Sequence, residues 1–146
     1  MKVVYLTRAY SLSAGHRLFD PRLDDDANLQ LFGKCSLAGG HGHNYRLELT
    51  VMGTPDPKTG LVASPRDLDQ VVEEEVFERL DHRSLNDVLT QDFGPAPTTE
   101  VLILELWRAL QPRIAPLATL HSLRVSETAK NTFEYFGPAD ADGGDL

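Results

Sequence analysis

The alternation of residues from His41 to Val51 constrains the fold of this chain more than any other feature. The odd positions of this segment hold histidine, tyrosine, leucine or valine, whereas the even positions include asparagine, arginine, glutamate and threonine. A period of two is typical of a strand with one buried face. The segment therefore predicts a strand that carries His41 and His43 on the same face as its apolar side chains.

Three further segments have the pattern or composition of strands. They are residues 2–14, 117–127 and 132–136, which alternate in polarity or are enriched in Val, Tyr and Thr. Residues 20–34 are polar and contain Pro21 and three consecutive aspartates, so we expect a loop there.

Two helices are expected between the second and third strands. The first has Ser64 as its N-cap and Pro65 at its first helical position, which is a strong start signal. Its apolar face consists of Val71, Val72, Val76, Phe77 and Leu80. The second helix begins near Thr98 and is expected to end at Pro112, because proline lacks the amide hydrogen that the helix interior uses.

The order strand, strand, helix, helix, strand, strand indicates an α+β fold. We expect a four-stranded antiparallel sheet with two helices on one face. A single domain is predicted over residues 1–138, followed by a disordered acidic tail at 139–146. The two edge strands of such a sheet leave backbone groups unpaired, which favours self-association.

Charge and composition narrow the classes of partner. The 146-residue chain has a formal net charge of −8, which argues against nucleic acid, and a polyphosphate ligand would need a local basic patch. Every apolar run is shorter than the roughly 20 residues of a membrane-spanning helix. Because the lone cysteine, Cys35, cannot form an internal disulfide, no oxidising compartment is required. We therefore expect a cytoplasmic protein.

His41-Gly42-His43 is the sharpest candidate for a metal site. Side chains two residues apart on a strand share a face, so both imidazoles can bind one ion, and Gly42 leaves room for the backbone to bend or to be approached closely. His16 ends the first strand and can supply a third ligand from a neighbouring antiparallel strand. Three protein ligands and one open position are typical of catalytic zinc. The alternative is three structural histidines bound only to protein groups.

Cys35 and the Asp81–His82 pair carry weaker signals. Cys35 lies six residues before His41, and from spacing alone it is a small buried side chain rather than a thiolate beside a cation. Asp81 can fix the tautomer of His82, but an acid at a helix end is more often simply solvated.

The carboxylate of Glu127 is a further candidate, since it shares the phase of Leu123 and Val125 and is expected on the apolar side of the sheet. A buried carboxylate needs a partner, which is either an internal hydrogen bond or Arg124, or else the guanidine-like edge of a heterocyclic ligand. The segment Thr98-Thr99-Glu100 is explained equally well as a helix cap.

Together these segments resemble the 6-pyruvoyltetrahydropterin synthase family. No single motif is decisive, but their ordered combination over residues 5–137 is highly specific. The matching motifs are Leu-Ser-Ala-x-His (12–16), Phe-Gly-Lys-Cys (32–35), His-Gly-His-Asn-Tyr (41–45), Gly-Leu-Val (60–62), Leu-Asp-His-x-x-Leu-Asn (80–86), Thr-Thr-Glu (98–100) and Glu-Thr (127–128).

The resemblance implies a fold, an assembly and a reaction. The fold is the tunnelling fold (T-fold), whose trimers close their sheets into a β-barrel and whose hexamer is a dimer of trimers. The reaction converts 7,8-dihydroneopterin triphosphate to 6-pyruvoyltetrahydropterin with loss of triphosphate. The implied cofactor is Zn²⁺ bound by His16, His41 and His43.

The resemblance also implies roles for the other candidates. Cys35 becomes the general base, which overturns its interpretation as a buried side chain. Asp81 and His82 assist proton transfer and are expected from a neighbouring subunit. The implied substrate-binding residues are Glu127, which anchors the pterin ring, and Thr99 and Glu100.

Some positions depart from the family pattern and leave the exact substrate open. Val101 follows Thr-Thr-Glu where many members have asparagine, Ser64 replaces asparagine or aspartate, and the loop before His41 lacks the usual asparagines. Position alone suggests three residues for holding the triphosphate, namely Arg17, Lys34 and Lys130.

Two alternatives remain beside the pyruvoyl synthase. A 6-carboxytetrahydropterin synthase shares the zinc site and starting pterin, but typically has a shorter gap between the cysteine and the His-x-His motif. A relative that trims the side chain to a hydroxymethylpterin usually carries glutamate in place of the cysteine, so Cys35 argues against that third activity. A non-catalytic, metal-binding oligomeric module would keep the three histidines and leave Cys35, Asp81 and His82 without a function.

Overall fold

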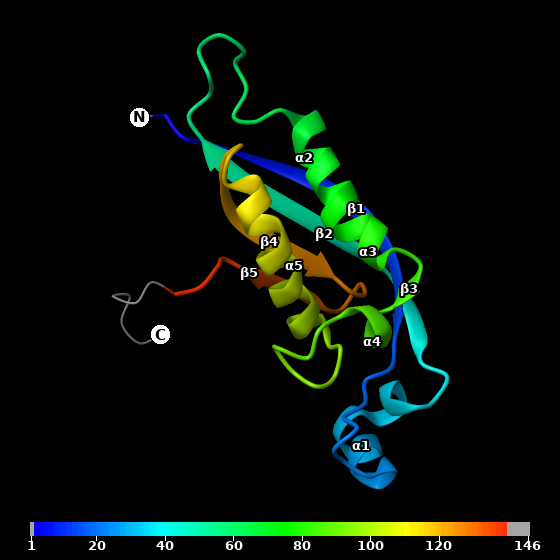
Figure 1. Ribbon diagram of the computed structural model, residues 1–146. Coiled ribbons are helices and arrows are strands. Elements are labelled where there is room, and N and C mark those ends of the chain that lie inside the picture. The colour runs from blue at the N-terminus through cyan, green and yellow to red at the C-terminus, as the bar shows by residue number, and fades with distance from the viewer. Residues whose placement is uncertain (1, 140–146) are drawn as a thin grey trace.

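The computed structural model describes residues 2–139, which form one five-stranded sheet with helices packed against it (Figure 1). The predicted α+β class is confirmed. Of the predicted tail, residues 140–146 lie outside the described part. The strands are β1 (Val4–His16), β2 (His41–Gly53), β3 (Arg83–Ser84), β4 (Thr119–Ser126) and β5 (Thr132–Tyr135).

The predicted four-stranded antiparallel sheet is wrong in one respect. The strand order is β3-β1-β2-β4-β5, and β3 pairs in parallel with β1 while the other neighbours are antiparallel. The added strand is the dipeptide Arg83–Ser84, which is too short to show any periodicity in the sequence. Its pairing with Ala14 and Gly15 brings the segment after the first helix beside the end of β1.

The two predicted helices begin where expected. The first consists of α2 (Pro65–Val72), a π-helical turn η2 (Glu73–Phe77) and α3 (Glu78–Leu80), with the Ser64 side chain accepting a hydrogen bond from the Asp67 amide. The second is α5 (Thr99–Ile114), capped by Thr98. Both lie on the same face of the sheet (Figure 1).

The predicted end of the second helix at Pro112 is wrong, because α5 continues to Ile114. A proline near the end of a helix removes one hydrogen bond and crowds the carbonyl four residues earlier, but the residues after it can still be helical. Ile114 is fully buried in the core, and the Ala115 amide still bonds the Gln111 carbonyl. Burial of this side chain therefore keeps the final turn helical.

The predicted loop at residues 20–34 contains helix α1 (Asp25–Phe32), followed by the 3₁₀ turn η1 (Gly33–Ser36). The Asp24 carboxylate caps α1 by accepting a hydrogen bond from the Ala27 amide at 2.7 Å. The negative charges of Asp25 and Asp26 in the first turn stabilise the helix through their attraction to the positive end of its dipole. The three aspartates therefore form the start of a helix, and the prediction of a loop throughout residues 20–34 is wrong. The short helix α4 (Leu85–Val88) follows β3.

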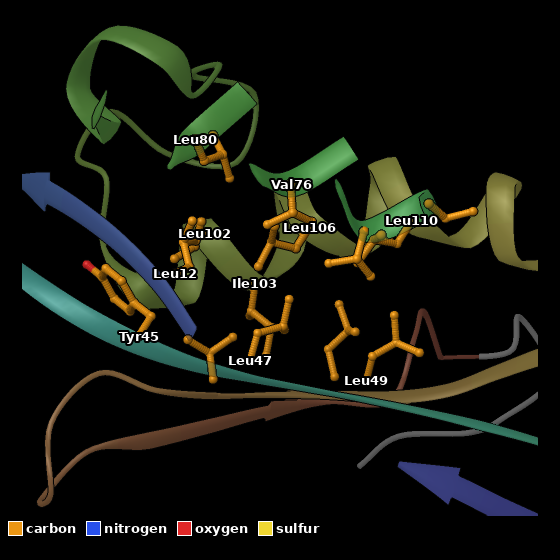
Figure 2. Close-up of a cluster of buried hydrophobic side chains, with 14 of the residues drawn as sticks. Leu12, Tyr45, Leu47, Leu49, Val76, Leu80, Leu102, Ile103, Leu106 and Leu110 are labelled. Carbon is orange, nitrogen blue, oxygen red and sulfur yellow. The ribbon is translucent and has the colours of Figure 1, made fainter. Parts of the chain in front are cut away.

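The core lies between the sheet and the helices, as Figure 2 shows. Leu102, Leu106 and Leu110 of α5 face Leu47 and Leu49 of β2. The same face of β2 continues through buried Tyr45 to His43 and His41. The histidines therefore extend the core-facing row at one end of the sheet. None of the helices in residues 2–139 is long and apolar enough to cross a membrane.

Candidate metal and active site

The antiparallel pairing of β1 with β2 brings the three predicted histidines together. His16 pairs with His41 and Ala14 pairs with His43 in the register of the two strands. The ligand nitrogens of the three imidazoles all lie within 4.8 Å of one another, and the Nε2 atoms of His16 and His41 are 3.0 Å apart. The sequence prediction that these residues can meet is therefore confirmed.

The orientation of His16 is set by a backbone group that sequence reasoning missed. Its Nδ1 lies 2.9 Å from the carbonyl oxygen of Pro97, to which it can only donate a hydrogen. Nε2 of the neutral ring is then a free acceptor that points at the other two histidines. A carbonyl behind an imidazole is the usual support of a metal-binding histidine. Pro97 is buried just before α5.

The electrostatics of the cluster also fit a cation. Burial lowers the pKa of His16, against the opposing effect of the Pro97 hydrogen bond, and burial likewise lowers the pKa of His43. Both rings are thus favoured as neutral ligands. Nε2 of His43 is buried without a hydrogen-bond partner in the described residues. A buried acceptor among other acceptors is costly unless an ion lies between them.

The backbone comes close to the backbone of His16 at Gly40 rather than at Gly42. Gly40 has φ +62°, and a Cβ there would lie 2.9 Å from the His16 carbonyl oxygen. A Cβ on Gly42 would meet its nearest atom at an ordinary 3.7 Å, so the close approach predicted at that glycine is wrong. Gly40 therefore lets the chain turn tightly into β2 and places His41 against His16.

The cluster opens on a cavity of about 840 Å³ whose lining includes His82 as well as the three histidines. The Nδ1 atom of His82 lies 2.9 Å from Oδ2 of Asp81, so the predicted contact within this pair is present. Oδ1 of Asp81 accepts the Ser13 amide at 3.0 Å, and the His82 amide bonds the Ser13 carbonyl. Both residues are therefore fixed to β1, close to His16.

The Asp81–His82 pair is arranged for proton transfer. Burial would raise the pKa of Asp81, but hydrogen bonds from Ser13 and His82 outweigh it and lower that pKa. An ionised carboxylate on Nδ1 leaves Nε2 of His82 as the free nitrogen. The His82 side chain is 80% exposed, which leaves that nitrogen open to a ligand in the cavity.

Glu127 lies closer to the histidines than the sequence indicates. It follows β4, its side chain is only 14% exposed, and Oε1 is 3.6 Å from Nε2 of both His16 and His43. The expectation that it turns to the apolar side of the sheet is met. Its neighbours are the two imidazoles and Asn131, whose side-chain amide donates to Oε2 at 3.5 Å, rather than Arg124. A negative charge there increases the affinity of the cluster for a cation.

Five predicted residues are not among those that line the cavity: Cys35, Asp81, Thr99, Glu100 and Glu127. Asp81 and Glu127 nevertheless contact histidines that line it. Cys35 lies partly buried in η1, where its carbonyl accepts the Leu18 amide at 2.8 Å. That bond ties the turn to the chain just after His16. Thr99 is buried at the start of α5, and Glu100 is exposed in the same turn. Their roles remain predictions.

Asn86 belongs to the family motif at residues 80–86, but the sequence analysis assigned it no function. Its side chain accepts the Arg17 amide at 2.8 Å and donates to the Arg17 carbonyl at 2.9 Å. This pair of hydrogen bonds fixes the backbone of the segment that follows His16. The signal in the sequence was the family motif at 80–86.

Fold and site together define an α+β protein with three histidines that could hold a metal ion and an adjacent carboxylate–histidine pair. The 6-pyruvoyl tetrahydropterin synthase family model matches residues 5–138. The 6-pyruvoyl tetrahydrobiopterin synthase of Drosophila melanogaster is 38% identical over 141 residues, which cover 97% of this chain and 84% of the relative. The Homo sapiens enzyme of that name is 39% identical over 132 residues, which cover 90% of each chain.

The structure of Caenorhabditis elegans 6-pyruvoyl tetrahydropterin synthase superposes with a TM-score of 0.86. It is 31% identical in sequence and covers 94% of this chain and 98% of its own. The chain therefore belongs to the 6-pyruvoyl tetrahydropterin synthase family, a family of enzymes. The family resemblance predicted from the motifs is confirmed.

Proposed function

We propose that this chain converts 7,8-dihydroneopterin triphosphate to 6-pyruvoyltetrahydropterin and inorganic triphosphate, with Zn²⁺ as its cofactor. One observation carries the proposal: three convergent imidazole nitrogens share a cavity with a carboxylate-bound histidine. Membership of the family supports the pterin substrate. The sheet order and the helices on one face are consistent with the tunnelling fold.

His16, His41 and His43 are the residues that would hold the ion, and a set of imidazole ligands suits zinc. When bound, Zn²⁺ would hold the side-chain hydroxyls of the substrate and make the neighbouring hydrogens more acidic. The Pro97 carbonyl keeps His16 in the ligand tautomer. Glu127 anchors the pterin ring in this proposal, with Thr99 and Glu100 in the pterin pocket.

The proton transfers fall to the chain's own side chains. Cys35 is the proposed general base that removes a proton from the substrate side chain. His82, held by Asp81, relays a proton through its free Nε2. His82 lines the cavity of its own chain, whereas the family resemblance implies that the pair comes from a neighbouring subunit. The subunit that supplies the pair to each site is therefore still a prediction.

The product separates this proposal from its nearest alternative. We expect purified, zinc-loaded protein to form 6-pyruvoyltetrahydropterin from 7,8-dihydroneopterin triphosphate, as identified by mass spectrometry. The presence of Cys35 and the six-residue gap to His41 favour this product. Formation of the 6-carboxy compound would instead assign the chain to that synthase. A protein that binds zinc but consumes no pterin would support the non-catalytic module.

We also expect a homohexamer built as a dimer of trimers. Only Ala14 and Gly15 of β1 pair with β3, so most of the outer edge of this long strand has no partner in the described residues. Tyr5 near its start is 56% exposed. Unpaired edges of this kind favour strand addition between subunits. Light scattering should give six times the 16.2 kDa chain mass, and a stable monomer at micromolar concentration would contradict this.

A further inference from the structure

The cavity beside the histidines differs in charge from the rest of the chain. The sequence contains 22 acidic residues against 14 lysines and arginines. Among the described residues that line the cavity, however, there is no aspartate or glutamate, whereas Arg17 and Arg83 are present. The nearest carboxylates, Glu127 and Asp81, lie behind the lining and contact imidazoles. A cavity of an acidic protein that is lined by guanidinium groups and by no carboxylate offers a local site for an anion.

The two arginines of the cavity also differ from the arginines elsewhere. Other arginines, Arg66 apart, each pair with a carboxylate: Arg8 with Asp69, Arg22 with Asp20, Arg46 and Arg124 with Glu48, Arg79 with Glu75, Arg108 with Asp92, and Arg113 with Glu74. Within residues 2–139, neither Arg17 nor Arg83 has such a partner. Their charges are therefore available to a ligand.

The guanidinium of Arg17 is already positioned. Its Nε donates to the Ser36 carbonyl at 2.6 Å, and its Cζ lies 3.8 Å from the centre of the Phe19 ring. The Asn86 side chain holds its backbone on both sides. These contacts leave both terminal nitrogens without a hydrogen-bond partner in the described residues. A planar fork fixed in this way is suited to phosphate oxygens and loses little entropy on binding.

Arg83 lies on the other element that borders the site. It follows His82 directly, and its backbone pairs with Ala14 of β1. Arg17 directly follows His16. Each arginine is thus one residue from a group that we place in the reaction. By contrast, Lys34 and Lys130, the other candidates that position suggests, do not line the cavity.

We propose that Arg17 and Arg83 bind the triphosphate group of the substrate, and therefore also the inorganic triphosphate that is released. The inference rests on the proposed function for the identity of the substrate, but the anion site itself rests on the cavity. Two guanidinium groups beside the histidines would hold the leaving group while the pterin side chain reaches the metal. Charge–charge contacts of this kind also offset the repulsion from a net charge of −8.

Titration of the purified protein with inorganic triphosphate by calorimetry tests the inference, with zinc content measured before and after. In Arg83→Gln and in Arg17→Gln we expect the Kd to rise about 10–100-fold, as for the loss of a charged hydrogen bond. The matched control is Arg66→Gln, which removes the same charge outside the cavity and should leave Kd unchanged. Arg83→Lys should restore part of the affinity.

Dihydroneopterin without phosphates provides the second arm, and its affinity should not change in either variant. Parental affinity of both variants for triphosphate would overturn the inference. Equal weakening for unphosphorylated dihydroneopterin would also overturn it, because the arginines would then contact the pterin. If triphosphate binding falls as expected but the parent protein makes no pterin product, the anion site stands and the proposed function fails.

Discussion

Replacing Cys35 by alanine should lower kcat by about 10²–10⁴-fold while zinc content and pterin binding stay at parental levels. The expectation depends on a separation of roles. The three imidazoles supply the ligand nitrogens, and the sulfur is not part of that cluster. Loss of a ligand would remove the metal, whereas loss of a general base removes only the proton transfer that occurs in the transition state. Steady-state kinetics with metal analysis of the same sample measures both.

The chain offers clean controls for this experiment. Cys35 is its one cysteine, so a thiol-directed alkylating reagent should inactivate the parent by modifying a single site. Leu37→Ala changes an exposed residue directly after the same 3₁₀ turn and should keep near-parental turnover. If Cys35→Ala retains parental activity and product, the base is elsewhere. His82 held by Asp81 then becomes the leading candidate, which Asp81→Asn would test.

The sequence predicts most of the frame on which the site is built, because strong periodicity reports burial directly. The alternation in residues 41–51 correctly places His41 and His43 on the face of Tyr45. Cap residues correctly place the starts of α2 and α5. The position of His16 opposite His41 follows from the register of two strands, which the sequence allows but does not specify.

The features that sequence reasoning missed depend on contacts between distant segments or on backbone atoms. Helix α1 is fixed by the buried side chain of Asn28, which accepts a hydrogen bond from the Asp20 amide. Because Leu29 and Leu31 of this helix are exposed, its sequence shows no apolar face with helical spacing. The carbonyl of Pro97 supports His16 across 81 residues of sequence, and no residue type marks a carbonyl for that role. The thiol of Cys35 was given a role by resemblance alone, and the single chain does not place it in the cavity lining.

Loss of the metal is the largest effect we expect from a single histidine. His41→Ala removes one of three ligand nitrogens, so zinc affinity should fall by more than the about 10–100-fold that is typical of a supporting residue. The substitution lies at the start of β2, beyond the apolar core, so the fold should survive. Metal analysis of the purified variant against the parent gives the stoichiometry, expected to be one zinc per chain in the parent.

A thermal unfolding series makes the result independent of activity. Zinc that binds only the folded state should raise parental stability by about 2.7 kcal/mol at a free concentration 100 times its Kd, and this increment should be absent in His41→Ala. The control is His121→Ala. It removes an imidazole that packs edge-to-face against Tyr5, with ring centroids 4.9 Å apart, and that is not part of the cluster of His16, His41 and His43. It should keep both the zinc and the increment. Full zinc occupancy together with the parental increment in His41→Ala would place the metal elsewhere in the protein.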